Sequence, residues 1–157
     1  MQTLITPALV VEHAFGDGEY VAPEAVSEAA IVAAQESYVR PVTGDALFAR
    51  LLAGDHADFT RDYLAAPLAL YVRYLLAPQL DLRHGQCGTV QPRTDRFAAA
   101  SDTALRRSRR ALLSSARRLL RRASDHLDSH RAQFPLYDPR ANALNRCSTD
   151  GGLVQTR

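Results

Sequence analysis

The most constraining feature of this sequence is a long amphipathic helix, predicted from about Ser101 to Gln133. Its apolar residues fall on one stripe when positions are projected at about 100° per residue. The stripe consists of Leu105, Leu112, Leu113, Ala116, Leu119, Leu120, Ala123, Leu127 and Phe134. A helix of this length must bury its apolar side against other elements, so the pattern predicts a helical bundle.

Shorter helices are predicted before it, each bounded by a proline, a glycine or a capping residue. We expect them from Thr6 and Pro7 to Gly16, from Pro23 to Arg40, from a Thr43 cap to Gly54, and from Asp58 to Leu80 with a kink or restart at Pro67. The last of these is apolar almost all round. It is therefore expected to be the central and most buried helix.

The predicted fold is all-α, a small bundle of about four to five helices in one domain over residues 1–139. A length of 157 residues with 46% hydrophobic content is enough for one core without disulfide or metal staples. Glycines and a proline interrupt the pattern between about 81 and 100, where we expect a projecting loop or hairpin around Thr89–Gln91. Residues 140–157 are predicted to be an extended or flexible C-terminal tail.

Several classes of protein are excluded by the pattern of residues. Cys87 and Cys147 have neither the spacing of a zinc site nor that of a redox pair. The apolar stretch Tyr63–Leu80 is interrupted by prolines and an arginine, which argues against a membrane span. The N-terminus does not resemble a secretion signal, so we expect a protein of the cytosol.

The formal net charge of +2 conceals a strong asymmetry along the chain. Residues 1–62 carry ten acidic residues and three arginines, a balance of −7. Residues 106–122 carry eight arginines and no acidic residue, a balance of +8. Such a bipolar distribution bears on association and partners more than on the fold.

Seven of the eight arginines are expected to project from the long helix, away from its apolar stripe. They are Arg106, Arg107, Arg110, Arg117, Arg118, Arg121 and Arg122. This face could be solvated, contact an acidic protein surface such as a neighbouring copy, or contact nucleic-acid phosphates. Arg109 falls inside the apolar stripe instead. If it is buried it needs a carboxylate or carbonyl partner, which we expect from an acidic helix.

The sequence carries no credible catalytic or cofactor site. His126 and His130 have the i, i+4 spacing that could place two metal ligands on one helix face. The glutamate that a HExxH site needs is missing, so capping or packing is the default interpretation. No nucleophile, base and orienting group can be assembled, and we expect no enzyme, cofactor, metal site or small-molecule substrate.

Three segments, in order, resemble the head-to-tail connector (adaptor) proteins of tailed bacteriophages and prophages. AAIVAAQESYVRPVTGDALFARLLAG (Ala29–Gly54) is similar to that family's opening signature, and DYLAAPLALYVRYLLAP (Asp62–Pro78) to its proline-containing apolar helix. GTVQP (Gly88–Pro92) then leads through ASD (Ala100–Asp102) to a long helix closing at QFPLYDP (Gln133–Pro139). The resemblance covers roughly residues 24–139.

The resemblance implies a helical adaptor that forms a ring between the portal and the tail and lets DNA pass through its centre. Its partners would be copies of itself, the portal protein and tail-side connector proteins, with non-specific contact to the DNA backbone. It would occupy the bacterial cytoplasm during assembly and the head–tail junction of the virion. A ring needs two different patches on each subunit, which suits a chain with an acidic half and a basic helix.

A second function class uses the same arginines. A helical DNA-binding regulator could lay the arginine-rich last helix on duplex phosphates, with binding that weakens steeply with salt. Against this class, the sequence shows no short helix-turn-helix pair ahead of that helix.

Overall fold

The computed structural model describes residues 2–16, 19, 21–81 and 100–145, and the backbone of four short strands between and beyond these ranges. The helices are α1 (Pro7–Ala14), α2 (Glu28–Ala34), α3 (Arg40–Thr43), α4 (Asp45–Leu52), α5 (Ala57–Phe59), α6 (Ala65–Asp81) and α7 (Asp102–Ser129). Two π-helical segments, η2 (Gln35–Val39) and η3 (Thr60–Leu64), join α2 to α3 and α5 to α6. The 3-10 turns are η1 (Pro23–Ala25) and η4 (Arg131–Gln133).

Because the π segments are continuous with their neighbours, the helices of the described chain form five rods. The predicted all-α bundle of four to five helices is therefore confirmed. Two antiparallel strand pairs stand apart from it, β1 (Arg83–Gly85) with β2 (Gly88–Val90) and β3 (Ser148–Asp150) with β4 (Leu153–Gln155). The first pair gives the predicted loop a hairpin, whereas residues 91–99 lie outside the described residues.

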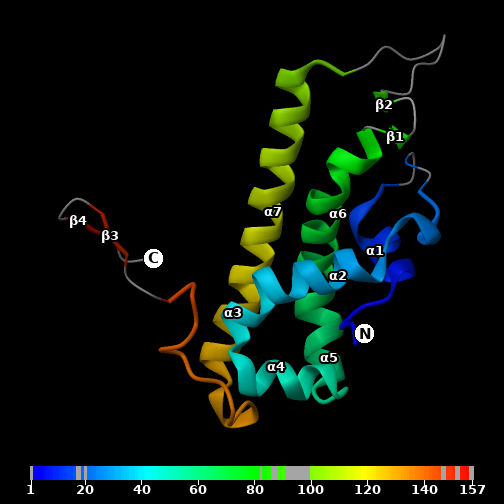
Figure 1. Cartoon of the computed structure of the whole chain (residues 1–157). Coiled ribbons are helices and arrows are strands. Elements are labelled where there is room, and N and C mark those ends of the chain that lie inside the picture. Colours follow the sequence, from blue (N-terminus) through cyan, green and yellow to red (C-terminus); the bar gives the residue numbers. More distant parts are fainter. Residues whose placement is uncertain are drawn as a thin grey trace.

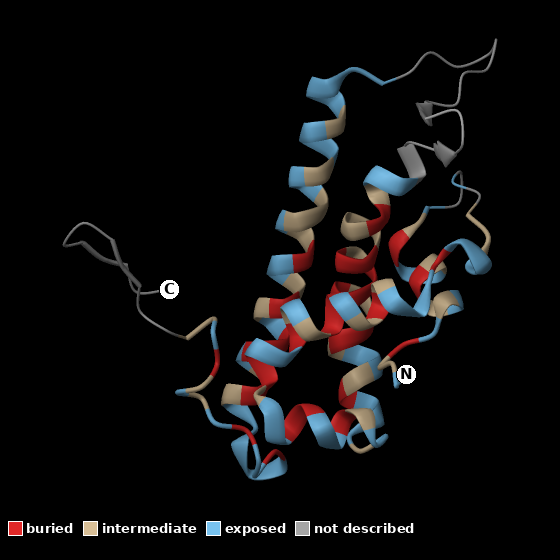
Figure 2. Cartoon of the chain, viewed as in Figure 1, coloured by how far each residue is buried: buried red, intermediate tan, exposed pale blue. Residues whose placement is uncertain are grey.

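The core is built around α6, which runs antiparallel to α7 while α1 and α2 pack on other sides of it (Figure 1). Leu68, Ala69 and Val72 of α6 have no exposed surface, as expected for the central helix. Leu120 and Leu127 of α7 complete the core from the opposite side. Burial concentrates where these helices meet (Figure 2).

Burial along α7 is uneven. Its fully buried residues all belong to its C-terminal half, from Ala116 to Leu127. In the N-terminal half, Leu105, Leu112 and Leu113 belong to the predicted stripe and are only partly buried. The N-terminal half of α7 therefore contributes no fully buried residue to the core, and Arg109 in this half lies over the ring of Tyr74 on α6.

The helix predicted to stop before Pro41 instead continues to Thr43. The amide of Arg40 bonds to the carbonyl of Gln35, five residues back, so the register changes just before the proline. Pro41 then falls in the first turn of α3, where a missing N–H costs nothing. The irregularity predicted at Pro67 likewise takes the form of a π segment, η3, immediately before α6.

The predicted Thr43 cap is wrong by one residue. Gly44 occupies the N-cap position of α4 with φ of +78°, a backbone conformation that glycine adopts without steric cost. The Thr43 hydroxyl turns back and donates to the carbonyl of Val39 at 3.2 Å. The Thr6 cap and the Gly54 stop are confirmed: the Thr6 hydroxyl caps α1, and Gly54, with φ of +94°, follows α4.

The helix predicted from Pro23 begins instead at Glu28, because the Ser27 hydroxyl caps α2 and Pro23 opens only the 3-10 turn η1. The long helix predicted to reach Gln133 ends at Ser129.

The chain from Phe134 to Asn145 packs back on the bundle, including the first residues of the predicted tail. Asn142 is completely buried, and its side-chain amide donates to the hydroxyls of Ser124 (2.8 Å) and Tyr137 (2.7 Å). The Tyr137 hydroxyl donates to Asp128, and the Asn142 carbonyl oxygen accepts from the amide of Leu144 at 2.9 Å. We call this network the C-terminal latch. It fixes the segment that leaves α7 to the end of the same helix.

Candidate interaction surface

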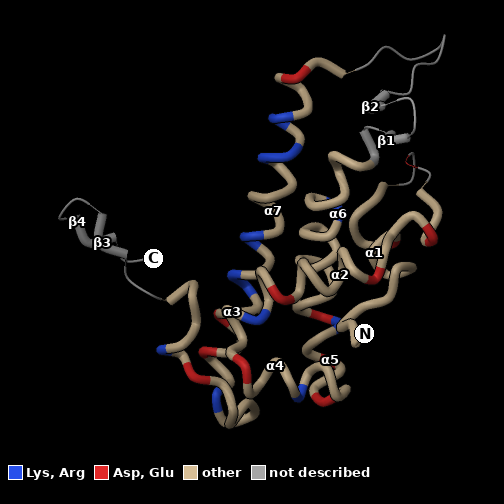
Figure 3. The backbone as a smooth tube through the Cα atoms, in the orientation of Figure 1, with Lys and Arg blue, Asp and Glu red and all other residues tan. Residues whose placement is uncertain are grey.

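The seven arginines predicted to form a face do lie on the surface of α7. Six of them are exposed, and Arg121 is half-buried because it donates to the carbonyl of Leu144 at 2.8 Å. Arg121 also contacts Asp125 at 3.2 Å, whereas the six others form no ion pair with any described residue. These arginines follow one side of the helix (Figure 3). We call the seven residues the arginine face.

The arginine face works against the stability of its own helix. Arg106 and Arg110, Arg117 and Arg121, and Arg118 and Arg122 are like charges at i, i+4 spacing. Such pairs destabilise a helix by about 0.2–0.5 kcal/mol each. Ordinary solvated surfaces intersperse both signs of charge, and this row of arginines departs from that pattern.

Arg109 differs from the prediction. It is partly buried as expected, but among the described residues it forms no ion pair, and its Nε is buried without a hydrogen-bond partner. Its guanidinium instead lies 5.1 Å from the ring centroid of Tyr74 on α6. A cation–π contact replaces the expected carboxylate because α6 presents rings rather than acidic side chains at this level.

Most acidic residues of the N-terminal half are engaged in local pairs. Glu36 and Asp45 each contact Arg40 at 2.7 Å, and Asp58 and Asp62 both contact Arg61. The acidic excess read from the sequence is therefore partly neutralised within the subunit.

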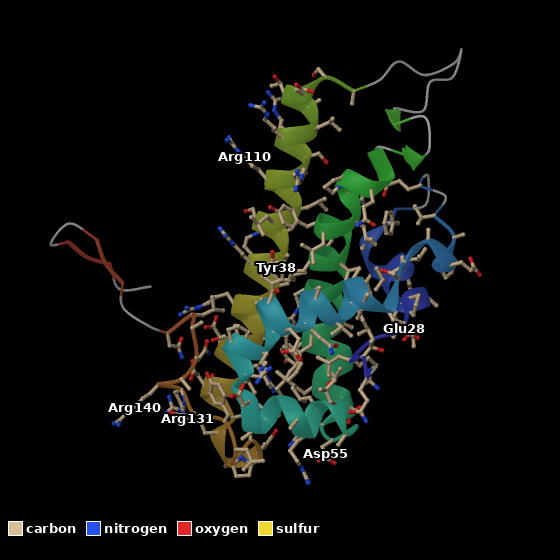
Figure 4. The ribbon with its side chains drawn as sticks, in the orientation of Figure 1. Glu28, Tyr38, Asp55, Arg110, Arg131 and Arg140 are labelled. Carbon is tan, nitrogen blue, oxygen red and sulfur yellow. The ribbon has the colours of Figure 1, made fainter. Side chains whose placement is uncertain are left out.

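Three exposed glutamates form no ion pair within the described chain, and we call them the acidic edge. They are Glu12 of α1, Glu24 of η1 and Glu28 at the start of α2. Figure 4 places Glu28 and Arg110 on opposite sides of the molecule. Each subunit thus presents free positive and free negative charge on two different surfaces.

The rings of the two histidines at the end of α7 stack on each other. The ring of His126 lies 4.1 Å from that of Tyr63 and 4.1 Å from that of His130, centroid to centroid. Arg122 covers the Tyr63 ring at 5.1 Å, and His130 Nδ1 lies 3.0 Å from the carbonyl of His126. Within the described residues, no three His, Cys, Asp or Glu side chains gather to hold a metal ion.

Acidification should weaken the bundle through His126. Burial, and then the charges of His130 and Arg122, hold the pKa of His126 below its usual 6.5. As pH falls through 6.5, the unfolded chain takes up this proton before the native protein does, so native stability declines. Urea unfolding at pH 7.5 and pH 5.5 measures the decline, and His126→Phe, which keeps the stack, should reduce it. An equal decline in His126→Phe would assign it to other groups.

No helix in the described part of the chain has both the length and the apolar character needed to cross a membrane.

A protein-family model covers most of the chain. A model described as a family of unknown function (DUF6712) matches residues 23–146. The chain belongs to the DUF6712 family. No curated protein and no solved structure matched it. The DUF6712 match begins at η1 and runs past residue 139, so it spans the arginine face and the C-terminal latch and leaves α1 outside.

Sequence reasoning identified the arginines of this DUF6712 chain and missed two features that lie near its C-terminus. The C-terminal latch depends on Asn142, which no periodic pattern marks because it follows the last helix. The stack of Tyr63 on His126 joins segments more than sixty residues apart, and only folding brings them together.

Proposed function

We propose that this chain is a structural subunit that assembles with copies of itself into a ring, as the head–tail adaptor of a tailed phage or prophage. Such a ring would lie between portal and tail and let DNA pass. The observation that carries the proposal is the placement of unpaired arginines and unpaired glutamates on opposite sides of one subunit. A surface of one sign then meets a different surface of the opposite sign on the next copy.

The all-α fold and the segments similar to connector proteins support the same assignment. Heterologous contacts repeat from copy to copy and either close into a ring or grow into a filament. In a ring, part of the arginine face would meet the next acidic edge, and arginines left over would face the DNA phosphates. The subunit would then be found in the bacterial cytoplasm during assembly and in the virion afterwards.

Light scattering on the full chain tests the proposal. We expect an oligomer whose mass rises with protein concentration and falls as salt screens the facing charges, since the Debye length shortens from about 10 Å at 0.1 M to about 3 Å at 1 M. The same series with the portal protein of the same phage should give a complex. A chain that stays monomeric throughout and ignores the portal would contradict the proposal.

The DNA-binding regulator remains the second candidate because six arginines of the arginine face form no ion pair with a described residue. It predicts a monomer or dimer that binds duplex DNA, with affinity falling linearly on a log–log salt plot. Duplex binding without assembly or portal binding would favour that candidate.

A further inference from the structure

One apolar side chain stands out on the surface. Leu136 is 49% exposed, the only exposed large hydrophobic residue in the described part of the chain. It lies in a turn between Phe134 and Tyr137, which are both buried. The amide of Tyr137 donates to the carbonyl of Phe134 at 3.0 Å, and the Tyr137 hydroxyl belongs to the C-terminal latch. Leu136 is therefore held out from the surface by a fixed turn.

An apolar pocket of about 260 Å³ opens elsewhere, between the N-terminal segment, α1, the end of α4 and η3. Its walls include Leu4, Ile5, Leu9, Leu51, Leu52 and Thr60. An engineered apolar cavity of about 150 Å³ binds benzene, so this pocket has room for a leucine side chain. We call it the N-terminal pocket.

The N-terminal segment that lines one side of the pocket is held in place by hydrogen bonds. The side-chain carbonyl oxygen of buried Gln35 accepts from the amide of Leu4, and its side-chain amide donates to the carbonyl of Gln2, each at 3.0 Å. Thr60, on the opposite wall, has a buried hydroxyl with no hydrogen-bond partner among the described residues. An apolar occupant from outside would remove the apolar walls of the pocket from water.

The turn and the pocket lie on different sides of the subunit. Arg131 and Arg140, which bracket Leu136 in the chain, and Asp55, which lies among the pocket residues Gly54 and Ala57, are separated across the lower end of the bundle (Figure 4). Arg110 of the arginine face lies on the same side as Arg131 and Arg140, and Glu28 of the acidic edge lies on the same side as Asp55 (Figure 4). One head-to-tail placement of two copies can therefore bring together both the opposite charges and the apolar pair.

We infer that the N-terminal pocket receives Leu136 of the next copy, and that this contact fixes the register of the assembly. The inference rests on the proposed self-assembly and adds an apolar contact to it. Long-range charge attraction orients two copies, whereas a side chain seated in a pocket determines one relative position. The charge pairs alone would tolerate sliding along α7, where arginines repeat over several turns.

Cross-linking tests the contact directly. Cys87 and Cys147 are replaced by serine, and a chain with Leu136→Cys is mixed with a chain carrying Ala57→Cys at the pocket rim. We expect a short bismaleimide to join the two different chains into a heterodimer. Ala33→Cys, an exposed alanine on α2 outside the pocket, is the matched control and should not link. Linking of Leu136→Cys chains to each other, or equal linking of the control, would overturn the inference.

Light scattering on Leu136→Ser and Ala57→Phe separates this inference from the proposed function. Both variants alter exposed side chains and should keep the thermal midpoint of the parent. We expect each to weaken assembly by about tenfold or more, the scale of losing one buried leucine contact. Unchanged assembly in both variants would overturn the pocket contact and leave the adaptor proposal standing. A parent chain that never assembles, alone or with portal, would overturn both.

Discussion

Replacing Arg106, Arg107 and Arg110 with glutamate should leave the chain folded and unable to assemble with itself. None of the three forms an ion pair with a described residue, and all are exposed on the loosely held half of α7. Reversal turns attraction toward the acidic edge into repulsion, and like-charge contacts cost several kcal/mol across an interface. We expect assembly to weaken by about 100-fold or more, equivalent to about 2.7 kcal/mol, measured by light scattering at low salt.

A charge swap provides the matched control. A second chain carries Glu12→Arg, Glu24→Arg and Glu28→Arg, which reverses the acidic edge. Each variant alone should stay dispersed. Because heterologous contacts pair one surface with the other, mixing them should restore the contact between the reversed arginine face and the reversed edge. Recovery in the mixture identifies the two surfaces as partners; loss without recovery would place the arginines against something else, and duplex DNA is then the first ligand to test.

Replacing Asn142 with alanine should produce the largest loss of stability from a polar substitution. The change removes three hydrogen bonds, to Ser124, Tyr137 and Leu144, at a site without solvent access. Buried groups left without partners cost about 1–3 kcal/mol, so we expect the free energy of unfolding to fall by about 3 kcal/mol. Urea unfolding of the full chain measures it.

Asn145→Ala is the control for that measurement. Asn145 is the same residue type three positions later, half-buried, and its side chain makes one hydrogen bond, to Asp128 at 2.8 Å. We expect a loss of about 1 kcal/mol or less. Equal losses in the two variants would mean that Asn142 contributes little to the stability that the C-terminal latch provides.

The fold could be predicted where its information is local. The apolar stripe of α7, the Thr6 cap and Gly54 are each encoded within a few residues, and all three hold in the structure. The helix geometry at Pro41 and Pro67 is not predictable from the local sequence. A π segment before each proline changes the hydrogen-bond register and lets the helix continue. That adjustment depends on packing against the rest of the bundle, which a single helical segment does not record.

The candidate surfaces also include features that the sequence predicts and features that it does not. A row of arginines without acids can be recognised in the sequence because the charges are contiguous. The Glu36–Arg40 pair can also be recognised, because the two residues have i, i+4 spacing on one helix. The ion pair of Asp45 with Arg40 cannot be predicted in this way, since Asp45 reaches Arg40 only after the turn at Gly44 has formed. The N-terminal pocket combines walls from two distant segments, residues 3–13 and 51–65, and Leu136 lies where helical periodicity has ended.

The uneven burial of α7 gives one helix two levels of local stability. Unwinding the half that contains Ala116 and Leu127 requires global unfolding, whereas the half that contains Arg106 and Arg110 can open at a lower free energy. A neighbour that neutralises those arginines removes their mutual repulsion, so docking and helix ordering are thermodynamically linked. In the proposed ring, part of the attraction between neighbours would therefore offset the cost of ordering this half of the helix.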